Sequence, residues 1–398
     1  MPSTLPDGDL APRDGALPAS ALDALASTPF GVYLHVPFCS VRCGYCDFNT
    51  YTATELGGGA SQASYAATAV REIDLLAGVL PGAPQVETVF FGGGTPTLLP
   101  AADLVVMLGA VRDRFGLVAD AEVTTEANPD SVTPESLAAL REGGFTRVSF
   151  GMQSAVRSVL AVLDRTHDPE RVPQAVQWAR DAGFDQVSLD LIYGTPGESV
   201  ADWETSVRAA LACAPDHVSA YSLIVEEGTA LARQVRSGVI GMPEEDDLAE
   251  KYLLVDALME EAGLGWYEVS NWSRDRAARC RHNELYWTSA NWLGIGPGAH
   301  AHVGGVRWWN VKHPTAYAQR LEAGASPAFA REVLDEDTRH TERVLLEVRL
   351  RDGLPLGLVD RDAAEVVVLA GNAVIEDDRL VLTRTGRLLA DAVVRDLL

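Results

Sequence analysis

The stretch "HVPFCSVRCGYCDFNTY", residues 35–51, holds three of the five cysteines of this chain. Cys39, Cys43 and Cys46 have the spacing C-x3-C-x2-C, and soft thiolates select zinc or iron–sulfur clusters. A structural zinc ion needs four ligands, and no nearby Cys or His completes a familiar zinc spacing. Three thiolates can hold three irons of a [4Fe–4S] cluster and leave the fourth iron open to another ligand. Because the same spacing also fits one face of a helix with buried cysteines, the surrounding sequence must decide.

The surroundings of this motif show a repeated strand–helix pattern. From residue 31 onward, short apolar segments recur, and each is followed by Gly or polar residues and then by a helical stretch. Such alternation is typical of βα units around a parallel sheet. Six strands are too few for the standard eight-stranded barrel, so we expect an α/β fold with an open, partial (βα)6 barrel. The expected strands span residues 31–38, 86–91, 122–127, 147–152, 186–193 and 217–224.

Unusual polar residues gather where these expected strands end. Cys39 follows the first strand and the segment 92–95 (Gly-Gly-Gly-Thr) follows the second. Glu126 ends the third, Gln153 follows the fourth and Asp190 lies late in the fifth. In βα barrels this edge binds ligands. The cysteines at the end of the first strand therefore indicate an iron–sulfur cluster in a ligand site.

The rest of the chain divides by composition. The Ala-, Pro- and Asp-rich residues 1–29 predict a flexible tail, and the barrel is expected over 30–230. An α+β extension follows over 231–335, with a long helix at 243–264 and a strand at 266–272. The last unit, 336–398, reads as helices plus a hairpin around Asp377 and Asp378, which is typical of a small winged-helix-like domain.

Charge and targeting signals narrow the function classes. The 32 basic and 56 acidic residues give a net charge of −24, which argues against non-specific nucleic-acid binding. The first 29 residues have no basic segment leading into an apolar stretch, and no apolar run approaches the length of a membrane helix. An odd cysteine count does not suit a secreted disulfide framework. We therefore expect a cytoplasmic protein.

With these motifs in place, the chain resembles the radical S-adenosylmethionine (SAM) superfamily. The resemblance implies that Cys39, Cys43 and Cys46 ligate the cluster and that the amino and carboxylate groups of SAM chelate the fourth iron. The reduced cluster of such proteins cleaves SAM to a 5′-deoxyadenosyl radical. Glu126 and Asp190 suit the cationic end and the ribose hydroxyls of SAM. The residues expected to contact SAM are Tyr33, Tyr45, Gly93, Gly94, Thr95, Glu126, Gln153, Arg165, Asp190 and Ile224.

The resemblance is closest to the coproporphyrinogen III dehydrogenase-like branch, over roughly residues 30–398. It rests on "YLHVPFC", "FFGGGTPTLL", "EANPDS", "SFGMQS" and "DLIYGTPG". Dehydrogenases of this branch (HemN) carry a fourth cysteine, C-x3-C-x2-C-x-C, at the position of Phe48. The HemW heme chaperones carry C-D-F there, and later H-N-x-x-Y-W, which is "HNELYW" (282–287) in this chain. Both marks point to the HemW family.

The "HNELYW" segment also has a direct physical interpretation. A histidine beside aromatic residues is suited to be an axial ligand and a stacking wall for a porphyrin. The alternative is a packing motif in which His282 and Asn283 satisfy backbone groups. His300, His302 and Cys280 compete as heme ligands, His300 can instead line the SAM pocket, and Cys213 reads as a plain buried thiol. The resemblance makes His282, Asn283, Tyr286 and Trp287 the heme candidates.

The resemblance implies a protein that binds heme and delivers it to an acceptor, such as a respiratory hemoprotein. It also implies peripheral association with a membrane. No catalytic residue is assigned, and whether SAM is cleaved during transfer stays open. One alternative is an enzyme that oxidatively decarboxylates the two propionates of coproporphyrinogen III, against which Phe48 argues. Another is a radical SAM enzyme with a different substrate.

Overall fold

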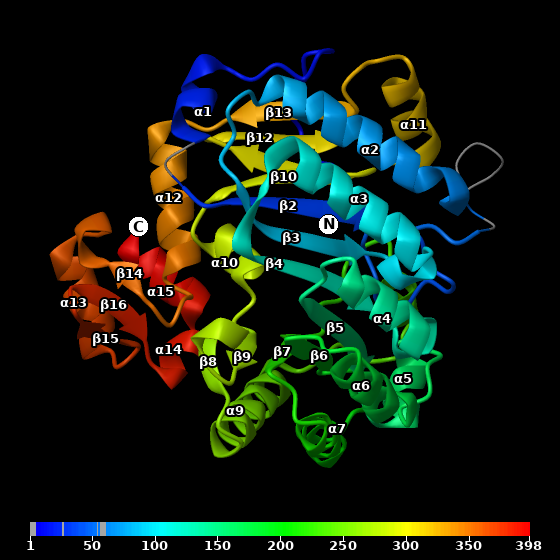
Figure 1. The fold of residues 1–398 in the computed structure, drawn as a ribbon. Helices are drawn as coiled ribbons and strands as arrows, with labels where there is room; N and C mark the ends of the chain where they lie inside the picture. Colours follow the sequence, from blue (N-terminus) through cyan, green and yellow to red (C-terminus); the bar gives the residue numbers. More distant parts are fainter. Residues whose placement is uncertain (1–4, 26–27, 54, 56–60) are drawn as a thin grey trace.

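A curved sheet of 13 strands forms the centre of the protein in the computed structural model, which describes residues 5–25, 28–53, 55 and 61–398. Six neighbouring strands are parallel and follow one another in sequence order (Figure 1). They are β2 (Phe30–Val36), β3 (Val86–Gly93), β4 (Leu117–Ala127), β5 (Arg147–Gln153), β6 (Gln186–Tyr193) and β7 (His217–Ser222). The six strands expected from the sequence are therefore confirmed, with shifted ends.

Helices cover the outer face of these strands (Figure 1). They are α2 (Gln62–Val79), α3 (Ala101–Phe115), α4 (Pro134–Glu142), α6 (Arg171–Asp181) and α7 (Val200–Ala212). The short helices α5 (Arg157–Val162) and α8 (Ala230–Arg236) share a separate apolar cluster that includes Val159, Ile192 and Leu231. Ser and Thr side chains start several of them by accepting a backbone N–H, as Thr133 does for α4 and Ser199 for α7. Glycines follow the ends of α3 and α4, so the helices end where the sequence predicts.

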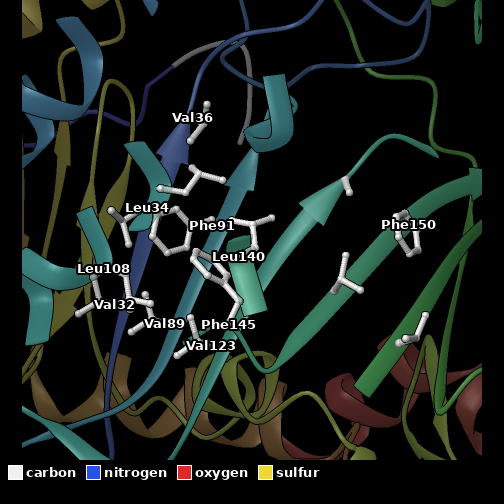
Figure 2. Packing of buried hydrophobic residues seen from close by; sticks show 14 of the residues in the cluster. Val32, Leu34, Val36, Val89, Phe91, Leu108, Val123, Leu140, Phe145 and Phe150 are labelled. Atoms are coloured by element: carbon white, nitrogen blue, oxygen red, sulfur yellow. The ribbon is translucent and has the colours of Figure 1, made fainter. Parts of the chain in front are cut away.

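Alternate residues of each strand face opposite ways, which separates the core from the interior of the barrel. Val32, Leu34 and Val36 of β2 are fully buried in the core between sheet and helices, whereas Tyr33 is only half-buried and lines an interior cavity. Figure 2 shows this core, with β-strand residues packed beside helical leucines. The labelled members are Val32, Leu34, Val36, Val89, Phe91, Leu108, Val123, Leu140, Phe145 and Phe150.

The extension lengthens the same sheet at both edges. Strand β10 (Asn291–Ile295) pairs parallel with β2, and β9 (Asn271–Ser273) pairs antiparallel with β7. The single strand expected over 266–272 is wrong, because the chain turns at 269–270 and forms β8 (Gly265–Glu268) and β9 instead. The other extension elements are α9 (Glu245–Glu261), α10 (Arg281–Trp287), β11 (His300–Val303), β12 (Val306–Asn310), α11 (Pro314–Glu322) and β13 (Ala328–Val333).

The stretch expected to be a tail contains two elements. Strand β1 (Asp9–Leu10) pairs with β13, and α1 (Ala19–Ala24) buries Ala21 completely. The Ala- and Pro-rich sequence has no periodicity that predicts such contacts, since they depend on the edge of a distant strand. The domain limits at residues 30, 231 and 336 stay a prediction.

The C-terminal unit has its own core and a three-stranded sheet. Its hairpin turns at Asp377 and Asp378, which both have positive φ, as a tight hairpin turn requires. A buried ion pair between Arg387 Nη2 and Asp256 Oδ2, 2.7 Å apart, attaches the unit to α9. Its elements are α12 (Glu336–Glu347), β14 (Leu354–Pro355), α13 (Arg361–Leu369), β15 (Ala373–Glu376), β16 (Arg379–Leu382), α14 (Arg384–Leu388) and α15 (Ala390–Leu397).

None of the helices in the described part of the chain combines the length and the apolar character that a bilayer crossing requires.

Candidate functional site

The three clustered cysteines line one pocket at the carboxyl end of the parallel strands. Cys39, Cys43 and Cys46 are half-buried free thiols around a cavity of about 150 Å³. Among the described residues, no three His, Cys, Asp or Glu side chains are placed to hold a single metal ion. In a [4Fe–4S] cluster each thiolate binds a different iron, so three cysteines need not converge on one point. The arrangement fits the cluster expected from the spacing.

Backbone hydrogen bonds hold the cysteine loop (residues 39–46) against its neighbours. The Cys39 N–H donates to the Tyr51 carbonyl at 3.1 Å, which closes the loop on its own return segment. Gly44 donates to the Leu163 carbonyl at 3.2 Å and accepts from the Leu231 N–H at 2.8 Å. The loop is therefore braced by the ends of α5 and α8, and its thiols are free of disulfides.

Burial raises the pKa of the Cys39 thiol to about 11, and the neighbouring Cys46 and Cys43 add to the effect. Burial also raises the pKa of Cys46. These two thiols are therefore protonated at neutral pH, and iron binding must displace their protons.

The glycine triplet packs directly against the cysteine loop. Gly93 has φ +109°, and a Cβ on Gly94 would lie 2.4 Å from the Phe38 carbonyl oxygen, so glycine is required at both positions. The N–H of Thr95 donates to the same Phe38 oxygen at 2.8 Å, and the N–H of Gly94 donates to Val36 at 2.8 Å. These amides are used within the protein, so the carbonyl oxygens are the atoms of this turn that remain for a ligand's amino group.

Two half-buried carboxyl groups stand beside this turn. Oε2 of Glu126 accepts the Gly93 N–H at 3.1 Å, and Oδ2 of Asp190 accepts from the Ser149 hydroxyl at 2.8 Å. Burial and the nearby Asp190 raise the pKa of Glu126 to about 8. Burial also raises the pKa of Asp190. Protonated carboxyls can donate to hydroxyl groups, and a bound cation would draw them toward the ionised form.

Arg165 and Gln153 complete the pocket. Gln153 ends β5 with φ +60° at a register shift between β5 and β6, a strained conformation that is common in binding sites. Nη2 of Arg165 donates to the Gly151 carbonyl at 2.7 Å, and its Nη1 lies 3.7 Å from the Cys43 sulfur. Its buried Nε has no hydrogen-bond partner among the described residues. The guanidinium thus retains a donor beside the cysteines.

A second cavity of about 680 Å³ adjoins this pocket and runs into the barrel. Its volume lies in the range of small-molecule sites. The residues that line both cavities are Tyr45, Cys46, Phe48, Gly93, Glu126, Gln153 and Asp190. The structure therefore brings the expected SAM residues and three of the four expected heme residues around one continuous space. The further residues from the two sets that line the larger cavity are Tyr33, Ile224, His282, Asn283 and Tyr286.

Trp287 is the expected site residue that lies outside both cavities. It is half-buried on α10, and its indole N–H donates to the carboxylate of Glu268.

His282 is part of the cavity wall, and both of its ring nitrogens are hydrogen-bonded within the protein. Its Nδ1 bonds the Thr88 hydroxyl at 2.7 Å and its Nε2 bonds the Tyr286 hydroxyl at 2.9 Å. The ring stacks on Phe90 with centroids 5.2 Å apart. Burial lowers the pKa of His282 to about 3, so the imidazole is neutral. Axial ligation by this residue requires one of the two hydrogen bonds to break.

The other candidate heme ligands, His300, His302 and Cys280, differ in whether they line the cavity and whether their side-chain atoms are already hydrogen-bonded. His300 lines the larger cavity, and its buried Nε2 has no hydrogen-bond partner in the described part of the chain. Nδ1 of His302 donates to the Ala290 carbonyl at 2.8 Å, outside this cavity. Cys280 is buried and lines the cavity. Cys213, expected to be buried, is half-buried at the end of α7 because nothing covers that helix end completely.

The lower part of the cavity contains residues that were not expected from the sequence. Thr124, Arg147, Ser188, His217 and Ser219 line it, all from the barrel strands. A signal was present, because polar residues occupy every second position in "RVSFG", "QVSLD" and "HVSAY". A period of two places these residues on one face of each strand, here the inner face.

Comparison with known proteins agrees with this geometry. Residues 33–210 match the family model described as the radical SAM superfamily. The chain is 54% identical to the heme chaperone HemW of Mycobacterium tuberculosis, over 97% of this chain and 99% of the relative. It is 33% identical to the heme chaperone HemW of Bacillus subtilis, over 82% of each chain.

Among solved structures, Escherichia coli coproporphyrinogen III oxidase (HemN) superposes with a TM-score of 0.80 at 21% identity. The match covers 96% of this chain and 94% of that one, which confirms the expected fold. The curated relatives and the family model show that the chain belongs to the HemW family of the radical SAM superfamily.

Proposed function

We propose that this protein is a heme chaperone that holds a [4Fe–4S] cluster and SAM, binds heme and transfers it to an acceptor hemoprotein. The observation that carries the proposal is the 54% identity to a curated heme chaperone over nearly the whole chain. Membership of the radical SAM superfamily implies the cluster and SAM. The large cavity beside the cysteine pocket supports a ligand of heme size.

In this proposal Cys39, Cys43 and Cys46 ligate the cluster, which when reduced supplies the electron for SAM cleavage. Arg165 binds the carboxylate of SAM, which its unpartnered Nε and its place beside Cys43 support. The carbonyl oxygens of Gly93 and its neighbours accept from the SAM amino group. Glu126 and Asp190 orient the ribose, with Tyr33, Tyr45, Gln153 and Ile224 as further walls.

Heme would occupy the larger cavity, beside Asn283 and Tyr286. His282 stays a candidate axial ligand, provided that the Tyr286 hydroxyl moves away from its Nε2. His300 offers a nitrogen that needs no such exchange. Trp287 would act indirectly, by fixing α10 through Glu268. The protein would work in the cytoplasm, deliver heme to an acceptor such as a respiratory hemoprotein, and associate peripherally with membranes.

An anaerobic hemin titration of the cluster-loaded protein tests the proposal. We expect a stable complex with a shifted Soret band, because an axial nitrogen ligand changes the iron's electronic state. His282→Ala and His300→Ala form a matched pair, since both remove a cavity-lining imidazole. Loss of the shift in one variant alone identifies the ligand. Absence of any complex in the wild type would overturn the chaperone function.

The alternative enzyme is distinguished by its product. Phe48, which stands where the dehydrogenases keep a fourth cysteine, is 46% exposed at the border of both cavities. Anaerobic incubation with coproporphyrinogen III, SAM and a reductant is expected to yield no protoporphyrinogen IX. Formation of that product would favour the dehydrogenase instead.

A further inference from the structure

The floor of the larger cavity, where the barrel strands begin, carries a buried cation. Arg147 is the first residue of β5 and is 1% exposed. Its Nη1 donates to the Ala278 carbonyl oxygen at 2.9 Å. Its Nη2 is buried and has no hydrogen-bond partner among the described residues, although the side chain lines the cavity. A buried charged donor without a partner is costly, so this group points to an acceptor that arrives with a ligand.

The positive charge of Arg147 persists despite its burial. Burial acts against the charge, but nearby acidic groups, Glu122 and Asp190 among them, outweigh it and raise the pKa of the guanidinium. The carboxylate of Glu122 binds the start of α10. Its two oxygens accept the backbone N–H groups of Arg281 and His282, each at 3.0 Å. Within the described residues no hydrogen bond joins Glu122 to Arg147, so the cation is stabilised at a distance and its Nη2 remains available.

The neighbours of Arg147 add a second donor, and the nearby carboxyl of Asp190 accepts from the Ser149 hydroxyl at 2.8 Å. Thr124 pairs with Arg147 in the register of β4 and β5, so both side chains face the cavity. The Thr124 hydroxyl is also buried without a hydrogen-bond partner among the described residues. His217 is neutral, because burial lowers its pKa well below the usual value, and it bonds Ser188 at 2.7 Å and Tyr267 at 2.8 Å. The floor is therefore a small site with two available donors.

We propose that the cavity floor binds a carboxylate of the cavity's ligand, with Arg147 and Thr124 as the donors. The inference rests on the proposed function, in which the ligand is heme and the carboxylate is a propionate. A guanidinium matches the two oxygens of a carboxylate. The cavity wall above the floor contains Phe90, Tyr286 and Trp292, which suits an aromatic ring system.

The length of the barrel allows this orientation. Gln153 at the rim lies six positions after Arg147 at the floor of β5, which is about 20 Å at 3.3 Å per residue. A ligand anchored at the floor thus extends along the aromatic wall toward the cysteine pocket.

Hemin and hemin dimethyl ester, in which both propionates are blocked, provide the test. Both are titrated anaerobically into cluster-loaded wild type, Arg147→Met and Thr124→Val. We expect the ester to bind the wild type at least about 10-fold more weakly than hemin, because a charge-assisted hydrogen bond is lost. Arg147→Met should weaken hemin binding by about 30-fold and leave ester binding unchanged. Thr124→Val should weaken hemin binding by about 5-fold.

The controls separate anchoring from a structural role. Arg147→Lys keeps the charge without the planar fork and should give an intermediate loss for hemin. Without ligand, Arg147→Met should unfold at or above the wild-type temperature, because a buried, incompletely paired charge destabilises the fold. Equal weakening of hemin and ester, or no weakening of either, would overturn the inference. If Arg147→Met does not fold, the affinities of Thr124→Val for hemin and for the dimethyl ester decide whether the floor binds a carboxylate.

The outcome also separates this inference from the proposed function. If the wild type binds hemin and the ester equally, only the carboxylate site fails. If the wild type binds neither, the chaperone function fails.

Discussion

The cysteine loop (residues 39–46) and the α10 segment 282–287 both stand out in the sequence, yet the structure treats them differently. The cysteine thiols are half-buried and free, and they face a small pocket. The imidazole of His282 is 1% exposed, and both of its nitrogens are hydrogen-bonded within the protein. The cysteine loop directs its thiols to a pocket, where Arg165 Nη1 lies 3.7 Å from the Cys43 sulfur. The α10 segment instead uses the polar atoms of His282 to build a wall.

This difference shows how a binding group can be told from a supporting one. A buried polar atom without a partner is costly, so one that belongs to a cavity wall is a candidate to contact a ligand. Arg165 Nε, His300 Nε2 and Arg147 Nη2 share this property. His282 does not, and it therefore supports the wall unless heme displaces the Tyr286 hydroxyl. Three experiments test the contrast between the two segments.

The largest effect is expected at the cysteine loop. Cys39→Ser should abolish cluster assembly, because a hydroxyl is a poor ligand for iron–sulfur clusters. Iron and sulfide content after anaerobic reconstitution measures this. Cys213→Ser is the matched control, since that half-buried thiol on α7 lies outside both cavities. A full complement of iron and sulfide in Cys39→Ser would mean that Cys39 is not a cluster ligand, and the proposed difference between the cysteine loop and α10 would fail.

A smaller effect is expected at the partly unpaired guanidinium beside the loop. Arg165→Met should weaken SAM binding to the cluster-loaded protein by about 30-fold, through loss of a charge-assisted hydrogen bond. Equilibrium dialysis with labelled SAM measures it. Arg157→Met on α5 is the control, because Arg157 is exposed and pairs with Asp168 at 2.7 Å. Equal affinities in both variants would mean that the free Nε is not aimed at SAM.

The smallest effect concerns acid stability at α10. Burial lowers the pKa of His282 to about 3, so the unfolded chain takes up a proton near pH 6.5 that the folded chain does not. The stability that this group contributes is complete above pH 6.5 and is lost as the pH falls toward 3. Between pH 6.5 and 5.5, His282→Gln should lose about 1 kcal/mol less than the wild type.

Urea unfolding at several pH values measures this difference. Tyr286→Phe is the control, because it removes the partner of Nε2 and keeps the buried imidazole, so its acid dependence should match the wild type. An unchanged acid dependence in His282→Gln would show that the ring is more accessible than the structure indicates.

The parallel strands and the cluster motif were predictable because their signals are local. Apolar segments that alternate with helices define βα units, and the carboxyl ends of parallel strands meet at one edge, so Glu126 and Asp190 could be placed beside Cys39. The two edges of the sheet were not predictable. Pairing of β10 with β2 and of β1 with β13 joins segments far apart in the sequence, and no local pattern encodes the partner of an edge strand.

The sequence by itself determined the family of this protein and, with it, the expected cofactor chemistry. Ligand type and spacing in Cys39, Cys43 and Cys46 are chemical properties of a short segment, and Phe48 distinguishes the family within a few residues of them. Only the tertiary structure decided which polar side chains remain unpaired. Thr88 and Tyr286 occupy both ring nitrogens of His282. Nε2 of His300 has no such partner among the described residues. Hydrogen-bond satisfaction is a property of the packed interior, where partners come from distant strands, so it cannot be read from a motif.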